Sequence, residues 1–209
     1  MDFISARLNM VESQVRTNDV TDVDLVDAMR AIPRERFCPP GREHLAYAET
    51  EIEYAPGRWL LNPRDLGKLV FSVRPRPGER ALAIAAPYAA AVLGRMGLGV
   101  TALEPAEDAA RVRAMLVGEP VAVVGGRLPE PPPGAWDVIV AEGAVAAVPP
   151  AWIERLGPDG RLAAVERRGA LGKAQLYVRA GEGSVARRST FDATPPFIEG
   201  FQPAPTFQF

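Results

Sequence analysis

Glu104 is the residue whose type and position point most clearly to chemistry. It closes the apolar stretch "VTALE" and follows the first predicted strand-to-helix turn by about 20 residues. An acid at this place in a nucleotide-binding sheet accepts hydrogen bonds from the hydroxyl groups of a ribose. The alternative is that Glu104 only adds negative charge ahead of the helix that follows Pro105, where the helix dipole favours it.

Glu142 is a second candidate, because it follows the apolar stretch "WDVIVA" at the expected end of another strand. It could face a substrate, or it could instead cap a helix or face solvent. No metal site is expected, since Cys38 and His44 are the only cysteine and histidine in the chain. We interpret both as structural residues.

Short apolar runs that alternate with helical stretches would position these acids. This alternation begins at Arg80 and is typical of βα units that build a parallel sheet, where ligands bind at the carboxyl ends of the strands. The predicted fold class is α/β: a Rossmann-like sheet flanked by helices, with a helical N-terminal extension and a C-terminal antiparallel hairpin. Strands are expected at 81–85, 100–104, 121–124, 136–141, 161–166, 174–180 and 184–193, and a structured loop or short strand pair at 48–62.

The composition limits the partners of the chain. A net charge of −2 and a pI near 5.6 provide no basic field for a nucleic-acid backbone, so no nucleic-acid partner is expected. No apolar run approaches the 18 residues of a membrane span, and the first residues lack an apolar signal core. We therefore expect a cytoplasmic protein that does not bind membranes.

The turn after the first predicted core strand has an unusual composition for a ligand-binding loop. It reads Ala85, Ala86, Pro87 and contains no glycine. Glycine is used in such turns because it allows a tight bend and lets backbone N–H groups approach a ligand without a Cβ in the way. Pro87 has no N–H, but its fixed φ suits the first position of a helix. The residues favour a plain strand-to-helix turn over a cofactor cradle.

Several motifs in order along the chain resemble those of the protein-L-isoaspartate O-methyltransferase family. They are "NMVESQVRTNDVTDVDLVDAMRAIPRERFCPP", "HLAYAE", "GRWLLNP", "TALEP", "WDVIVAEGAVAAVPPAWIERLGPDGRL" and "FDATPPFIEGF". The resemblance covers nearly the whole chain and implies a class I methyltransferase fold that uses S-adenosylmethionine. It also implies methylation of the α-carboxylate of isoaspartyl residues in proteins or peptides. We expect a single methyltransferase-like domain over 1–209, with the N-terminal helical extension and loop in 1–78 and the α/β core in 79–209.

The chain departs from this family at the loop that carries its catalysis. The family pattern has hydroxyl residues at its third and fifth places, whereas this chain has Gly57, Arg58, Trp59, Leu60 and Leu61. Leu61 stands at the serine position and has no donor or acceptor, so it cannot orient a carboxylate. No catalytic residue is therefore assigned. Arg58 and Trp59 could fill the space of the methyl donor, or Trp59 could belong to the core.

The remaining cofactor positions are also altered. Ala85 and Ala86 replace a glycine-rich loop, and Gly126 stands where the family usually has an acid that meets the adenine side of the cofactor. Only Glu104 matches the family pattern clearly.

These departures leave two interpretations. One is a family member whose usual methyl transfer is lost or altered, and which acts through a protein partner or through self-association. The other is an active, divergent S-adenosylmethionine-dependent methyltransferase that acts on isoaspartyl carboxylates of protein or peptide substrates.

Overall fold

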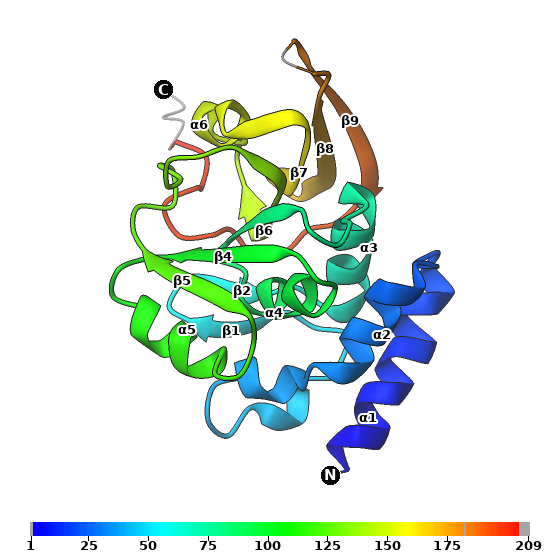
Figure 1. Ribbon diagram of the computed structural model, residues 1–209. Helices are drawn as coiled ribbons and strands as arrows, with labels where there is room; N and C mark the ends of the chain where they lie inside the picture. Colours follow the sequence, from blue (N-terminus) through cyan, green and yellow to red (C-terminus); the bar gives the residue numbers. More distant parts are fainter. Residues whose placement is uncertain (1, 182, 205–209) are drawn as a thin grey trace.

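The fold is built on a seven-stranded sheet with helices on both faces (Figure 1). The computed structural model describes residues 2–181 and 183–204. The strand order is β5-β4-β3-β6-β7-β8-β9. The first five strands in this order run parallel to one another, and β8 is antiparallel to both of its neighbours, β7 and β9. The strands are β3 (Arg80–Ile84), β4 (Gly99–Glu104), β5 (Val121–Gly125), β6 (Trp136–Val145), β7 (Leu156–Arg168), β8 (Leu171–Arg179) and β9 (Val185–Asp192). The predicted α/β class and the C-terminal hairpin of β8 and β9 are confirmed.

Three helices connect the parallel strands. They are α4 (Pro87–Arg95), α5 (Ala109–Met115) and α6 (Pro150–Glu154). Helix α4 packs against β3 and β4, and α6 packs against β7. Both α4 and α6 have proline in the first turn, where the missing N–H breaks no helical hydrogen bond.

The N-terminal part of the chain is helical, as predicted. Helix α1 (Phe3–Met10) continues as a π-helical turn (Val11–Val15) and a 3₁₀ turn (Arg16–Asn18), and α2 (Val23–Ala31) follows. Asp2 caps α1 by accepting hydrogen bonds from the backbone N–H groups at positions 4 and 5. The interruption of the α-helix within the first predicted helix was not visible in its apolar spacing.

Helix α3 (Pro63–Val73) links the N-terminal part to the sheet. The Asn62 side chain caps it by accepting a hydrogen bond from the Asp65 N–H at 2.9 Å. The helix packs against β6, β7 and β8, so it fixes the position of the residues that precede it. Those residues form the antiparallel pair β1 (Ile52–Ala55) and β2 (Arg58–Leu60), which settles the predicted choice between a loop and a strand pair for 48–62.

The core has a layer on each face of the sheet. Along β3, Ala81 and Ala83 belong to one cluster of buried side chains, whereas Leu82 and Ile84 belong to the other. The N-terminal helices and α4 contribute to the first cluster, and the second includes Trp152 of α6. No helix in 2–181 or 183–204 is long and apolar enough to cross a bilayer.

Candidate functional site

The candidate site lies at the carboxyl ends of β3, β4 and β6. From β3 the chain proceeds outward through β4 to β5, and it then returns to place β6 on the other side of β3. The strand order therefore reverses beside β3, which is where open α/β sheets bind ligands. This edge contains the turn after β3, Glu104 and Glu142. The residues packed around them determine whether a ligand can bind there.

The turn after β3 is closed and already hydrogen bonded. Ala85 has a φ of +47°, a left-handed conformation that side chains with a Cβ rarely adopt. Its N–H donates to the carbonyl of Leu103 at 2.9 Å, and Ala85 and Ala86 have no solvent-exposed surface. With no N–H on Pro87, the turn has few backbone donors to offer an anionic or polar ligand.

Glu104 ends β4 and is fully buried. One carboxylate oxygen accepts a hydrogen bond from the Tyr54 hydroxyl at 2.9 Å, and the other has no partner in the described chain. Burial raises the pKa of Glu104 to about 8, and the Tyr54 hydrogen bond and the nearby Arg58 guanidinium lower it only in part. Tyr54 belongs to β1, so the chain itself occupies one of the positions at which a ribose would bind Glu104.

Residues 57–61, which stand where the family has its catalytic loop, are mostly buried. Leu60 and Leu61 are fully buried, Arg58 is 7% exposed, and Trp59 is partly exposed. The Arg58 guanidinium donates to the carbonyl of Gly57 at 2.9 Å and lies near Glu104, whose pKa it lowers. Trp59 is therefore not a core residue, whereas the two leucines are.

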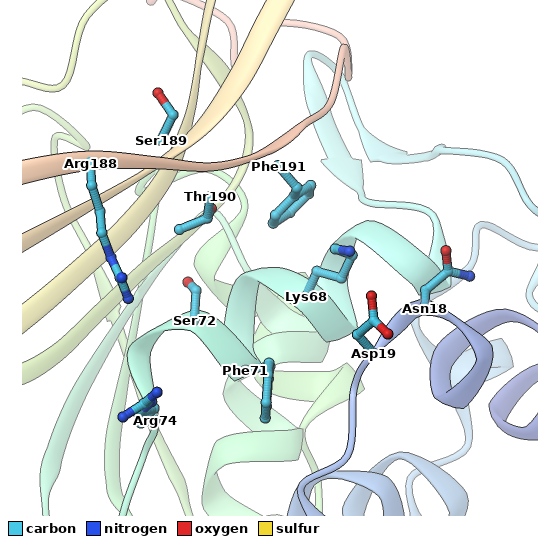
Figure 2. Close-up of a pocket in the computed structure, with 10 residues that line it drawn as sticks. All are labelled: Asn18, Asp19, Lys68, Phe71, Ser72, Arg74, Arg188, Ser189, Thr190 and Phe191. Atoms are coloured by element: carbon cyan, nitrogen blue, oxygen red, sulfur yellow. The ribbon is translucent and has the colours of Figure 1, made fainter.

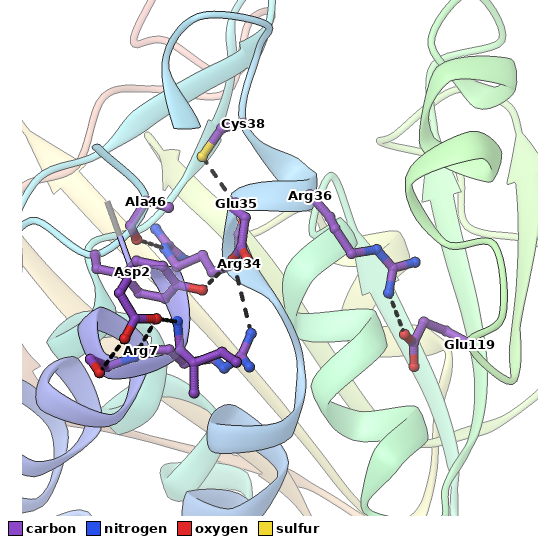
Figure 3. A network of polar contacts seen from close by, with 11 residues as sticks. Asp2, Arg7, Arg34, Glu35, Arg36, Cys38, Ala46 and Glu119 are labelled. Carbon is purple, nitrogen blue, oxygen red and sulfur yellow. Dashed lines mark hydrogen bonds and ion pairs between the residues drawn. The ribbon is translucent and has the colours of Figure 1, made fainter. Parts of the chain in front are cut away.

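Arg34 is hydrogen bonded to the end of this loop. It is fully buried; its Nε donates to the carbonyl of Ala46 at 2.8 Å (Figure 3), and its Nη2 donates to the carbonyl of Leu61. The guanidinium also lies over the ring of Tyr88, 4.9 Å from its centroid. Arg34, Tyr54 and Tyr88 were not identified from the sequence, because nothing in their local pattern shows that they meet at this edge.

Glu142 lies inside a strand. The prediction that a strand ends before it was wrong, because β6 continues to Val145 through an irregularity between Val140 and Ala144. Glu142 is fully buried, so the solvent-facing alternative was also wrong, and neither carboxylate oxygen has a hydrogen-bond partner in the described chain. Burial raises its pKa to about 8, and the Arg34 charge and the nearby backbone N–H of Ala89 oppose this only in part.

The segment after β9 covers the same edge. The N–H of Ile198 donates to the carbonyl of Ala144 at 2.9 Å, and the N–H of Glu199 donates to the carbonyl of Gly57 at 3.0 Å. Ile198 is fully buried. A Cβ on Gly57 would lie 2.4 Å from the Glu199 Cβ, so glycine permits this close approach. The segment and the β1–β2 pair thus close over the end of β6.

Gly126 completes the set of residues considered for a cofactor. It follows β5, is partly exposed, and its N–H donates to the carbonyl of Glu104 at 2.8 Å. The structure therefore brings Gly126, Glu104 and the turn at Ala85 to one edge, as the fold requires. The contacts around Glu104 do not fit S-adenosylmethionine in this arrangement, because Tyr54 and the buried leucines fill the region and no surface of Glu104 or Ala85 is exposed. In the described part of the chain, no group of three or more His, Cys, Asp or Glu is placed to hold a metal.

The comparisons with known proteins agree with the motifs. Residues 6–193 match the family described as protein-L-isoaspartate(D-aspartate) O-methyltransferase. The protein-L-isoaspartate O-methyltransferase of Methylorubrum extorquens (strain PA1) is 35% identical over 168 residues, which are 77% of this chain and 74% of that protein. This chain belongs to the protein-L-isoaspartate O-methyltransferase family. The family member of that name from Methanoculleus marisnigri is 31% identical over 166 residues, 76% of each chain.

Solved structures of the family share the fold. A protein-L-isoaspartate O-methyltransferase superposes with a TM-score of 0.76 at 22% identity, over 93% of this chain and 66% of its own. A putative family member from Plasmodium falciparum, in complex with S-adenosyl-L-homocysteine, gives a TM-score of 0.71 at 15% identity, over 92% of this chain and 98% of its own. At these identities the likeness concerns the fold alone. The resemblance inferred from the motifs is confirmed at the level of family and fold.

Proposed function

We propose that this protein is a member of the family that has kept the fold but lost the usual methyl transfer, and that it acts by binding another protein. The observation that carries this proposal is the burial of Glu104. Its carboxylate is fully buried and accepts a hydrogen bond from Tyr54 of the same chain, where a cofactor ribose would otherwise bind.

Two further features support the loss of methyl transfer. Leu61 is fully buried and has no polar side-chain atom, so it cannot hold a carboxylate in line with a methyl donor. The turn at Ala85 offers few free N–H groups, and its Cβ occupies the space that glycine leaves open for a ligand. Leu61 and Ala85 lie in different segments of the chain, so two separate segments are altered, and in addition the retained Glu104 is already bonded to Tyr54.

A protein partner is the class of partner that the family suggests, since its members are named for acting on aspartyl residues of proteins. A folded chain whose cofactor site is occupied by its own side chains still has surfaces that can bind another protein without catalysing a reaction. Self-association is the other form that such recognition could take.

A second candidate function is an active, divergent methyltransferase that binds S-adenosylmethionine after the β1–β2 pair moves. The observation that favours it is a group of buried carboxylate oxygens without partners, one on Glu104 and two on Glu142. Buried polar atoms usually have hydrogen-bond partners, and a cationic ligand rich in donors would provide them.

Calorimetric titration with S-adenosyl-L-homocysteine, together with its thermal shift, distinguishes the two candidates. We expect no heat and no shift at millimolar ligand. Because a ligand at 100 times its Kd stabilises a protein by about 2.7 kcal/mol, micromolar binding would raise the melting temperature measurably and would overturn the proposal.

A restored variant serves as the matched control. In this variant a glycine-rich loop of about five residues, the length in the family pattern, replaces Ala85 to Pro87. The variant also carries Leu61→Ser. Binding of the same ligand to this variant alone would show that these two segments account for the loss. No binding by either protein would place the loss elsewhere, at Tyr54 and Glu104.

A further inference from the structure

A groove runs between helix α3 and the edge strand β9, away from the carboxyl ends of the parallel strands. Figure 2 shows side chains from α3, from β9 and from the turn before α2 pointing toward the same space. The hollow has a volume of about 310 Å³. It is lined by Asn18, Asp19, Lys68, Phe71, Ser72, Arg74, Arg188, Ser189, Thr190 and Phe191.

The groove carries positive charge that the protein itself does not neutralise. Within the described residues, Lys68, Arg74 and Arg188 form no ion pair within 4.0 Å, and their side chains donate no hydrogen bond. Among the described residues that line this groove, Asp19 alone carries a carboxylate. Lys68 lies over the ring of Phe191, 5.5 Å from its centroid, which leaves its ammonium free for an anion.

The groove continues into a second hollow of about 360 Å³. The two share Ser72, Arg74 and Arg188, and the second adds Arg76, Arg161 and one carboxylate, Asp159. Arg161 is neutralised by Glu79 at 2.8 Å, whereas Arg76 has no ion pair in the described chain. Four cations that form no ion pair with any described residue therefore line one continuous groove, in a molecule whose net charge is −2.

The elements around the groove suit an extended ligand. Strand β9 is the last in the order of the sheet and pairs only with β8, so its other edge is not part of a strand pair in the described chain. Its residues from 186 to 190 are exposed. An extended peptide can add to such an edge through main-chain hydrogen bonds while its side chains reach neighbouring pockets.

We propose that this groove binds an extended acidic segment of a partner protein. Carboxylate side chains of that segment would pair with Arg74, Arg76 and Arg188, and its backbone would lie along β9. Charge complementarity of this kind gives specificity and speeds association. Nucleic acid fits the groove less well, because its regularly charged backbone needs a longer basic track than the cations that line these two hollows.

This groove and the cofactor edge are separate places. Arg161 is near the start of β7, at the opposite end of the parallel strands from Glu104. The groove proposal rests on the proposed function only in assigning a protein partner; binding in the groove does not depend on whether the protein binds S-adenosylmethionine, so its failure would leave the proposed loss of methyl transfer standing.

Fluorescence anisotropy with a labelled oligo-glutamate peptide tests the proposal on the full chain. We expect saturable binding that weakens as salt rises, and no binding of an oligo-lysine peptide of equal length. Arg74→Glu and Arg188→Glu should each weaken binding by about tenfold, because each replaces an attractive exposed charge with a repulsive one. Both residues are exposed, so the fold should be retained, which the melting temperature checks.

Arg42→Glu is the control, since Arg42 is exposed in a different part of the chain and changes the net charge by the same amount. Equal weakening by all three variants would mean a non-specific charge effect and would overturn the proposal. It would also be overturned by an absence of peptide binding, or by tighter binding of oligo-deoxythymidine or of pyrophosphate than of the peptide.

Discussion

Glu142 is a buried acid whose pKa is raised to about 8 by burial, from an ordinary value of 4.5. The unfolded chain loses this proton near pH 4.5, whereas the folded protein keeps it until near pH 8. Over this window the folded state binds more protons than the unfolded state. The free energy of unfolding should therefore fall as pH rises from about 4.5 to 8, and level off above it.

We predict that Glu142→Gln removes the share of this pH dependence that Glu142 contributes. The variant should be more stable than the natural protein at pH 8, by an amount on the order of a few kcal/mol, and should differ less at pH 5. Urea unfolding at pH 5, 6, 7 and 8 measures the difference. Glu104 also has a pKa of about 8, so part of the dependence should persist in the variant. A pH dependence identical to that of the natural protein would contradict the assignment.

The candidate site shows which residues a sequence can indicate and which it cannot. Glu104 was predicted at the end of its strand because a local apolar run and the acid that closes it lie next to each other in the chain. Its partner Tyr54 lies 50 residues away and has no motif of its own, so only the folded chain brings the two together. The burial of Glu142 was missed for a related reason, since the extension of β6 depends on pairing with β7 and with the segment after β9.

At the scale of elements, the β1–β2 pair is held closed by the segment that follows β9. Gly57, at the turn of the pair, has a φ of +64° and lies against Glu199. We predict that Gly57→Ala separates the two segments, because the new Cβ would lie 2.4 Å from the Glu199 Cβ. This overlap should lower the free energy of unfolding by roughly 1–3 kcal/mol in addition to the cost of the left-handed conformation, and hydrogen exchange at the Glu199 amide should become faster.

Gly41→Ala provides the control for this variant. Gly41 has a φ of +83°, but no atom of residues 2–181 or 183–204 lies within 4 Å of a Cβ placed there. It should therefore carry the cost of the left-handed conformation, of about 1–2 kcal/mol, without affecting the Glu199 amide. Equal exchange at that amide in both variants would refute the contact as the cause.

The order and type of the main elements followed from the sequence because each strand of the α/β core is a short apolar run bounded by a helix or turn. Strand pairing in the β1–β2 region was left open, because "AETEIEYAPGRWLLNP" alternates too irregularly for a confident strand. The structure resolves this region through the contacts of Gly57 with Glu199 and of Tyr54 with Glu104, which are tertiary rather than local.

For the whole molecule, Cys38 offers a probe of global unfolding. It is the only cysteine, it is 7% exposed, and burial raises the pKa of its thiol from 9.0 to about 11. Its thiol also lies 3.8 Å from the carbonyl of Arg34 (Figure 3). The reactive thiolate is therefore scarce in the folded protein at neutral pH.

We predict that Cys38 reacts with a thiol reagent at pH 8 at least about 100-fold more slowly in the folded protein than in concentrated guanidinium chloride. A shift of two pKa units alone reduces the thiolate by about that factor, and burial adds to it. Absorbance of the released thiol product over time measures both rates. Rapid modification of the native protein would mean that the region around Cys38 opens without global unfolding.

The hydrogen bond between Gly57 and Glu199 also affects the order in which the chain can fold during synthesis. About 140 residues separate the two partners in the chain. On the ribosome, the segment that contains Glu199 is therefore synthesised on the order of ten seconds or more after the β1–β2 pair. Until then Leu60 and Leu61 lack part of their final surroundings. The nascent chain therefore passes through a stage in which this edge is open, and a chaperone or a small molecule present during translation meets a surface that the finished protein hides.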